Sequence, residues 1–162
     1  MKSSTIAIAC ASFLAVAGAY AAPPIPVPGS PGIPPVIVVK APNLVPIASR
    51  MSKGTISVRN TGSVAAGPFK VTVECKNLGR GGCAEPPRGA AAAYDDPAFP
   101  NKLTILVPGL ATGHVSNHKI AFWDGLAWPS GNYEFTVIAD AGGAVAETNE
   151  GDNSGGTVMN VP

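Results

Sequence analysis

The segment from Ser130 to Asn153 constrains the fold more than any other part of the chain. Its first half alternates apolar with mostly polar residues at a period of two, which predicts a β-strand with one buried face. The residues of the buried face are Tyr133, Phe135, Val137 and Ala139. A glycine turn and an acidic, Asn-rich stretch follow, and we expect a return strand over Thr157 to Val161. The segment therefore predicts an antiparallel strand pair at the edge of a β-sandwich.

Further strands follow from the same pattern. Thr55 to Arg59 is predicted to be a half-buried strand that points Ile56 and Val58 inward and stops at the Asn60-Thr61-Gly62 turn. The next strand, after Pro68, has one apolar and one polar face. The apolar face holds Phe69, Val71, Val73 and Cys75, and the polar face holds Lys70, Thr72 and Glu74. Leu103 to Val107 is another short strand. Helical periodicity is absent, so we expect an all-β, antiparallel two-sheet sandwich, with a small barrel as the alternative.

His114 to Phe122 is predicted to be a longer strand. Since Ile120 and Phe122 would point inward, the period of two places both histidines on the same face, and we expect at least one to be half-buried. His114 and His118 would lie about 13 Å apart on a strand, too far to chelate one metal ion together. We therefore predict no metal site at this pair.

The N-terminal residues predict export. Lys2 precedes an apolar stretch, and Ala19 and Ala21 place small residues at a cleavage site, which is typical of a signal peptide over residues 1–21. A retained membrane anchor is the alternative, although the apolar stretch is barely long enough to span a bilayer. Residues 22–40 are proline-rich and predict a linker, and residues 41–162 are long enough for one domain. We expect a secreted or periplasmic protein with no membrane insertion after cleavage.

The charge of the mature chain argues against nucleic acid as a partner. Removal of Lys2 leaves ten Lys plus Arg from the eleven in the chain, against ten Asp plus Glu. A neutral chain without a basic stripe has no electrostatic attraction for phosphate. The two mature cysteines, Cys75 and Cys83, predict a disulfide, because exported thiols are oxidised. Without a nearby histidine they cannot complete a zinc shell.

Four sequence blocks are similar to the CARDB family, the cell adhesion related domain found in bacteria. The blocks are PNLVP, ISVRNTGSVAAGPFKVTV, VPGLATGHV and GNYEFTVIADAGGAVAETNEGDNSGGTVMNV. The resemblance covers most of the range from Pro42 to Val161 and implies an immunoglobulin-like sandwich of about seven strands with an adhesion-type role. Tyr133 also matches the tyrosine corner of such sandwiches, in which the hydroxyl bonds back to the backbone.

Two loops are longer than the family pattern implies. The first runs from Lys76 to Asn101, and the second carries Trp123 to Pro129. Surface loops are where such folds place recognition, so Trp123, Trp128 and Arg80 are the candidate binding residues. The alternative for the tryptophans, which we favour, is that at least one of them fills the end of the core.

An acidic cluster lies before the last strand and has two interpretations. It comprises Asp140, Glu147, Glu150 and Asp152, with Asn149 and Asn153 among them. Oxygen ligands at this density are of the type that binds Ca²⁺. The interpretation that we favour is structural, because Asp and Asn side chains bond to the backbone in turns.

The sequence contains no pattern that predicts catalysis. It lacks a serine elbow, and both mature cysteines are expected to be paired. We therefore expect a monomeric, non-catalytic adhesion-type module of the bacterial envelope, without a cofactor, that binds an envelope protein or polysaccharide through its long loops. The alternative is a structural accessory or assembly subunit that uses an exposed sheet edge.

Overall fold

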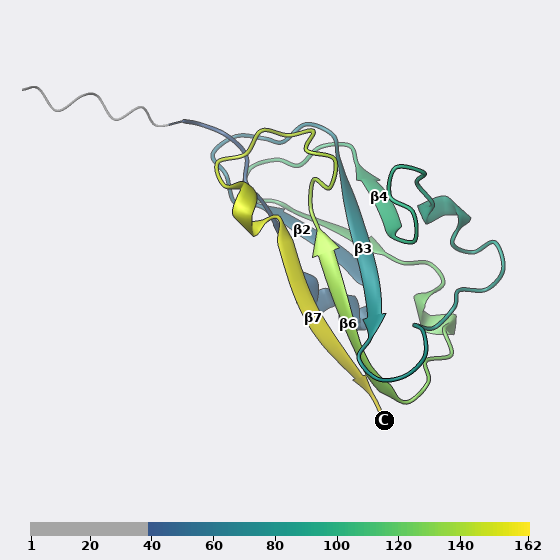
Figure 1. The fold of residues 1–162 in the computed structure, drawn as a ribbon. Helices are drawn as coiled ribbons and strands as arrows, with labels where there is room; N and C mark the ends of the chain where they lie inside the picture. The colour runs from purple at the N-terminus through teal and green to yellow at the C-terminus, as the bar shows by residue number, and fades with distance from the viewer. Residues whose placement is uncertain (1–38) are drawn as a thin grey trace, which may run out of the picture. The chain divides into compact units, whose positions relative to one another are not determined.

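Within residues 39–162, seven strands form two antiparallel sheets, which confirms the predicted all-β sandwich (Figure 1). The computed structural model describes residues 39–162, so the predicted signal peptide and nearly all of the predicted linker lie outside it. One sheet has the order β1-β2-β5 and the other β4-β3-β6-β7. The strands are β1 Leu44–Pro46, β2 Thr55–Asn60, β3 Phe69–Asn77, β4 Leu103–Val107, β5 Val115–Lys119, β6 Gly131–Ile138 and β7 Ser154–Val161.

In the described part of the chain, four short 3-10 helices interrupt the loops. They are η1 Ala48–Lys53, η2 Ala92–Tyr94, η3 Trp123–Gly125 and η4 Glu150–Asp152. Within residues 39–162 no helix has the length and hydropathy needed to cross a membrane. The short helices are connectors. Of the two long loops predicted from the sequence, the one from Lys76 to Asn101 contains η2, and the one from Trp123 to Pro129 contains η3.

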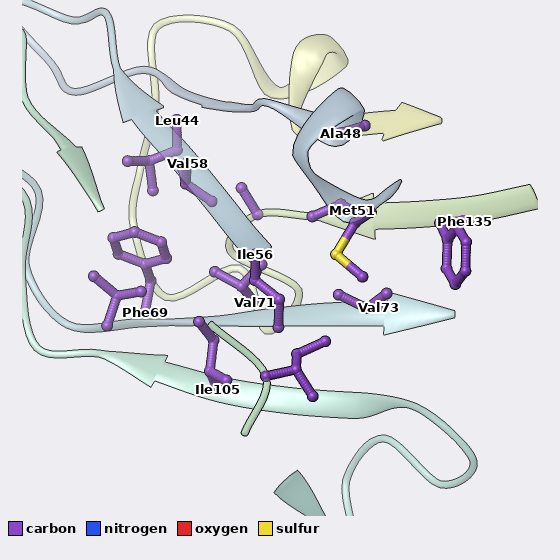
Figure 2. Close-up of a cluster of buried hydrophobic side chains, with 14 of the residues drawn as sticks. Leu44, Ala48, Met51, Ile56, Val58, Phe69, Val71, Val73, Ile105 and Phe135 are labelled. Atoms are coloured by element: carbon purple, nitrogen blue, oxygen red, sulfur yellow. The ribbon is translucent and has the colours of Figure 1, made fainter. Parts of the chain in front are cut away.

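The core follows the predicted alternation on β3 and β6 (Figure 2). Tyr133, Phe135 and Val137 are buried on β6, and Phe69 and Val71 are buried on β3, as expected. The outward faces depart from the prediction at some polar positions. These positions are Ser57 on β2 and Thr72 on β3, which are both buried. Thr104 on β4, a strand for which no outward face was predicted, is buried as well.

The neighbouring strands explain why Thr72 and Ser57 are buried. Thr72 lies between Thr104 and Ile138 in the register of the four-stranded sheet, so neighbouring strands cover it on both sides. Ser57 donates a hydrogen bond of 2.8 Å to Asn117 Oδ1 on β5. Period-two alternation identifies which face a residue takes but not what covers that face.

The prediction of one long strand over His114 to Phe122 was wrong, because β5 ends at Lys119. The chain then turns into η3, with the Ile120 amide bonded to the Gly54 carbonyl at 2.8 Å. The prediction of a half-buried histidine was also wrong, since His114 and His118 are both exposed. His118 pairs with Ile56 and so takes the inward side, yet β5 is an edge strand and leaves that side open.

The bounds of the first and last strands, β1 and β7, were not predicted from the residue alternation. The return strand begins at Ser154 rather than Thr157, and β1 pairs antiparallel with β2 from Leu44 opposite Asn60. Asn60 is fully buried, and its amide group makes four hydrogen bonds to the backbone. The Asn60 side chain therefore satisfies backbone groups that lie outside the strands, near the end of β2. This explains why a polar side chain is buried there.

Candidate functional site

A tyrosine corner fixes the loop that precedes β6. Tyr133 is fully buried, and its hydroxyl donates a hydrogen bond of 2.7 Å to the Pro129 carbonyl. This is the contact that the tyrosine corner requires, with the acceptor four residues upstream. The bond holds the C-terminal end of the segment from Trp123 to Pro129, which we call the tryptophan loop.

The tryptophan loop turns its two indole rings toward the core. Trp123 is only 7% exposed, which supports the interpretation that one tryptophan fills the end of the core. Its ring lies directly against Gly54, which has φ +65°, so a side chain at that position would collide with the indole. Trp128 is half-buried, with its ring centroid 5.1 Å from that of Trp123 and 5.7 Å from that of Phe135.

The other long loop, Lys76 to Asn101, carries Cys83 of the disulfide, and we call it the insertion. Cys75 and Cys83 are joined, with their Cα atoms 6.2 Å apart. Within the small loop that they close, the Asn77 side chain bonds to the carbonyls of Arg80 and Gly82. Arg80 is exposed there, and it is not among the residues that line the pocket described below.

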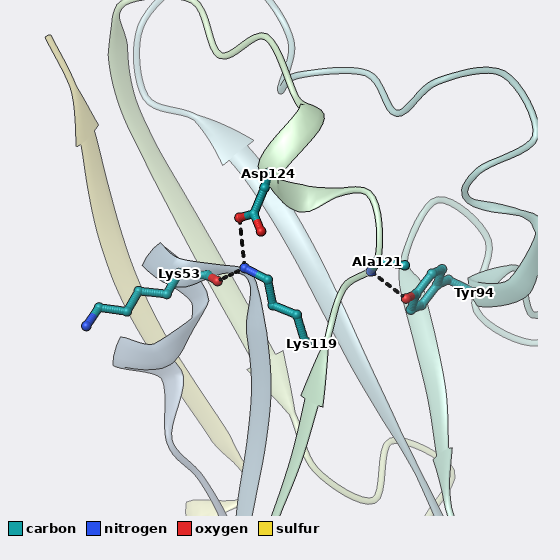
Figure 3. A network of polar contacts seen from close by, with 5 residues as sticks. All are labelled: Lys53, Tyr94, Lys119, Ala121 and Asp124. Carbon is teal, nitrogen blue, oxygen red and sulfur yellow. Dashed lines mark hydrogen bonds and ion pairs between the residues drawn. The ribbon is translucent and has the colours of Figure 1, made fainter.

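Tyr94 joins the insertion to Ala121 and Phe122, the two residues directly before the tryptophan loop. This residue of η2 is buried, and its phenol oxygen accepts a hydrogen bond of 3.0 Å from the Ala121 amide (Figure 3). Its ring packs edge-on against Phe122, with centroids 5.5 Å apart. Sequence reasoning did not identify Tyr94. The available signal was that an insertion rich in Ala, Gly and Pro contains only two aromatic residues, of which Tyr94 is one.

Lys119 fixes the other side of the tryptophan loop. Its ammonium group donates to the Lys53 carbonyl at 2.6 Å and to Asp124 Oδ1 at 2.9 Å (Figure 3). These bonds tie η3 to the end of η1. Lys119 and Tyr133 therefore hold the tryptophan loop itself, and Tyr94 holds the two residues that precede it.

A pocket of about 320 Å³ opens between the insertion and the tryptophan loop. We call it the inter-loop pocket. The residues that define it are Cys83 and Ala84 from the insertion, Trp123, Leu126 and Trp128 from the tryptophan loop, and Phe135 from β6. The structure thus brings the predicted disulfide and both candidate tryptophans to one apolar cavity, whereas Arg80 lies apart from it.

Charged groups also line the inter-loop pocket. Lys102 forms an ion pair of 3.3 Å with Glu74. Asp95 is exposed and has neither a hydrogen bond nor an ion pair through its side chain to another of the residues 39–162. The neighbouring Asp96 differs, because its hydrogen bond to Lys70 holds its pKa below the ordinary value of 3.8. The carboxylate of Asp95 therefore lines the pocket and forms no ion pair with another of the residues 39–162.

The acidic cluster serves the fold through backbone contacts. Asp140 accepts hydrogen bonds from the Ala144 and Val145 amides at 2.9 and 2.8 Å. Glu147 accepts one from the Leu44 amide, and Asp152 accepts one of 3.0 Å from the Asn43 side chain. The cluster thus fastens the segment before β7 to the entry strand.

Burial raises the pKa of Glu147 above its ordinary value of 4.5, against the effect of the Leu44 amide, and the charges of Glu150 and Asp140 raise it further. One oxygen of the Glu147 carboxylate is buried without a hydrogen-bond partner. Among residues 39–162 no three His, Cys, Asp or Glu side chains are grouped so that they would hold a metal ion. The favoured structural interpretation of the cluster is thus the one that its contacts support.

The comparison with protein families gives a match over residues 35–156 to the CARDB model. The chain belongs to the CARDB family. CARDB modules are adhesion-related domains, so membership gives this chain the general character of an adhesion-related module. The family resemblance read from the sequence blocks is confirmed.

The comparison with solved structures also gives a CARDB domain. It is the CARDB domain of a Pyrococcus furiosus protein, solved in complex with di-metal ions. The two chains share 14% identity with a TM-score of 0.43, over 76% of this chain and 96% of the other. A comparison with curated proteins gives no match.

Proposed function

We propose that this chain is an exported, non-catalytic binding module of a bacterial envelope that engages its partner at the inter-loop pocket. The observation that carries the proposal is the convergence of the insertion and the tryptophan loop on one apolar cavity. Binding sites are concave and mostly apolar, with a few polar groups that give orientation. The inter-loop pocket has this composition, with aromatic walls and the charged groups of Asp95 and Lys102.

The fixed geometry of the pocket supports the same proposal. Binding is weakened by the entropy of ordering mobile loops, so a loop that is already held binds more tightly. The insertion is closed by the Cys75–Cys83 disulfide and fastened through Tyr94, and Lys119 and Tyr133 fasten the tryptophan loop. Both walls of the pocket are therefore in place before a partner arrives.

A second candidate function is assembly through the edge of β7. This edge strand carries no charged residue and no proline over Ser154–Val161, and Val158 is 55% exposed. Charges and prolines are the usual means of preventing strand addition at an edge, and β7 has neither. The edge is thus suited to pairing with a strand of another subunit.

Partner capture by tagged variants distinguishes the two functions. Leu126→Asp places a charge in the inter-loop pocket, Ala127→Asp places the same charge on the neighbouring exposed residue, and Val158→Lys charges the edge strand. Each variant is first checked for a native melting curve and then used to capture partners from the envelope fraction of the producing cells.

We expect Leu126→Asp alone to lose the captured partner. Loss with Val158→Lys alone would favour assembly through β7. Capture that survives all three changes would contradict both functions.

A further inference from the structure

The inter-loop pocket suits an inserted apolar group better than a stacked sugar. A sugar ring needs the open face of an aromatic ring, yet Trp123 is almost fully buried. The half-buried ring of Trp128 packs against the rings of Trp123, Tyr133 and Phe135. A volume of about 320 Å³ is near the lower end of the range for ligand sites. Such a cavity holds one large side chain, and side chains of this kind are the usual anchors of protein interfaces.

The charges of the pocket select among polypeptide partners. Lys102 is occupied by Glu74, whereas the carboxylate of Asp95 is without a cation from residues 39–162. A basic residue next to the inserted side chain would meet this carboxylate. An acidic residue at the same place would be repelled.

We infer that the inter-loop pocket receives a large apolar side chain of a partner polypeptide, next to a Lys or Arg of that polypeptide that pairs with Asp95. This inference rests on the proposed function and adds the chemistry of the partner. It assigns two distinct roles. The apolar walls supply affinity, and Asp95 supplies selectivity for charge.

The tryptophans supply a direct readout, since the chain has two and both line the inter-loop pocket. The probes are acetylated and amidated glycine-flanked peptides with Phe-Lys, Phe-Glu or Ala-Lys at the centre, together with chitohexaose as a neutral oligosaccharide. Each probe is titrated up to millimolar concentration into the exported chain while the intrinsic fluorescence is followed.

We expect a saturable change with the Phe-Lys peptide, about fivefold weaker binding of the Phe-Glu peptide, and no saturable change with the Ala-Lys peptide or chitohexaose. Asp95→Asn should weaken binding of the Phe-Lys peptide by about fivefold and abolish its advantage over Phe-Glu. Glu85→Gln, a change at an exposed residue of the insertion that does not itself line the pocket, should leave both affinities unaltered.

Three results would overturn the inference: no saturable response to the Phe-Lys peptide, equal binding of the Lys and Glu peptides, or a response to chitohexaose in place of the peptides. The capture experiment with Leu126→Asp separates this outcome from failure of the proposed function. If that variant still loses its partner, the pocket is the binding site and only the class of ligand is wrong.

Discussion

The Ala121 amide donates a hydrogen bond of 3.0 Å to the phenol oxygen of Tyr94, and this bond joins loops that the sequence places 27 residues apart. Ala121 lies between the end of β5 and the start of the tryptophan loop. The insertion is thus part of the folded domain rather than a free surface loop. The inter-loop pocket depends on this attachment.

Tyr94→Phe should loosen the insertion. The Ala121 amide would lose its acceptor while the ring packing stays, so we expect the free energy of unfolding to fall by about 1 kcal/mol. Trypsin should also cut faster after Arg80 and Arg88, which are exposed in the insertion. Phe99→Leu, which alters the other aromatic residue of the insertion, is the control for the cleavage rate. An unchanged rate in Tyr94→Phe would show that the bond does not hold the insertion.

Tyr133→Phe tests the tyrosine corner. The change leaves the buried ring in place and removes the donor to the Pro129 carbonyl, so urea unfolding should show a loss of about 1–2 kcal/mol. Ser130→Ala removes an exposed hydroxyl that bonds to the Pro162 carbonyl in the same region and should cost less than about 0.5 kcal/mol. Equal losses in the two variants would contradict a special role for the corner.

Period-two alternation predicted the buried faces of β3 and β6, because a strand in a two-layer sandwich has one face toward the core. It failed at the end of β5, where the Lys119 side chain bonds to η1 and η3 and the chain turns. It also failed for His118, because burial at a sheet edge depends on what lies beside the strand. Here the Tyr94 ring packs against His118, which nevertheless stays exposed.

The candidate site was predicted in part. The disulfide and both tryptophans were identified from residue type and loop length, but their convergence was not, because Cys83 and Trp123 are 40 positions apart in the sequence. Contacts between distant loops depend on the sheet order, which local patterns do not encode. Tyr94 was missed for the same reason.

Loss of the disulfide should affect both stability and the pocket. Replacing Cys75 and Cys83 together by serine removes a short cross-link, so the free energy of unfolding should fall by about 2.5 kcal/mol on the chain-entropy model. The melting temperature of the double variant, with and without reductant, is the measurement. We expect reductant to lower the melting temperature of the parent chain and to leave that of the variant unaltered. A parent chain that melts at the same temperature in reductant would contradict a stabilising disulfide.

Glu147→Gln should stabilise the domain at neutral pH. The folded pKa of Glu147 is raised, so the stability linked to its protonated form is present below about pH 4.5 and is lost as the pH rises through the folded value. Glutamine keeps an acceptor for the Leu44 amide and places an NH₂ donor in a region of negative charge. We expect the melting temperature at pH 7 to rise by about 2 °C, with the difference shrinking toward pH 4. Glu85→Gln is the exposed control, and a gain of equal size at both pH values would contradict this linkage.

Site-specific photo-crosslinking in the producing cells is the most direct test of partner binding at the inter-loop pocket. A photoreactive benzoylphenylalanine is placed at Ala84, which lines the inter-loop pocket, or at Val158 on the exposed face of β7. If the partner binds at the inter-loop pocket, we expect a discrete crosslinked partner from position 84 and none from position 158. A partner crosslinked from position 158 alone would contradict binding at the inter-loop pocket and favour assembly through the sheet edge.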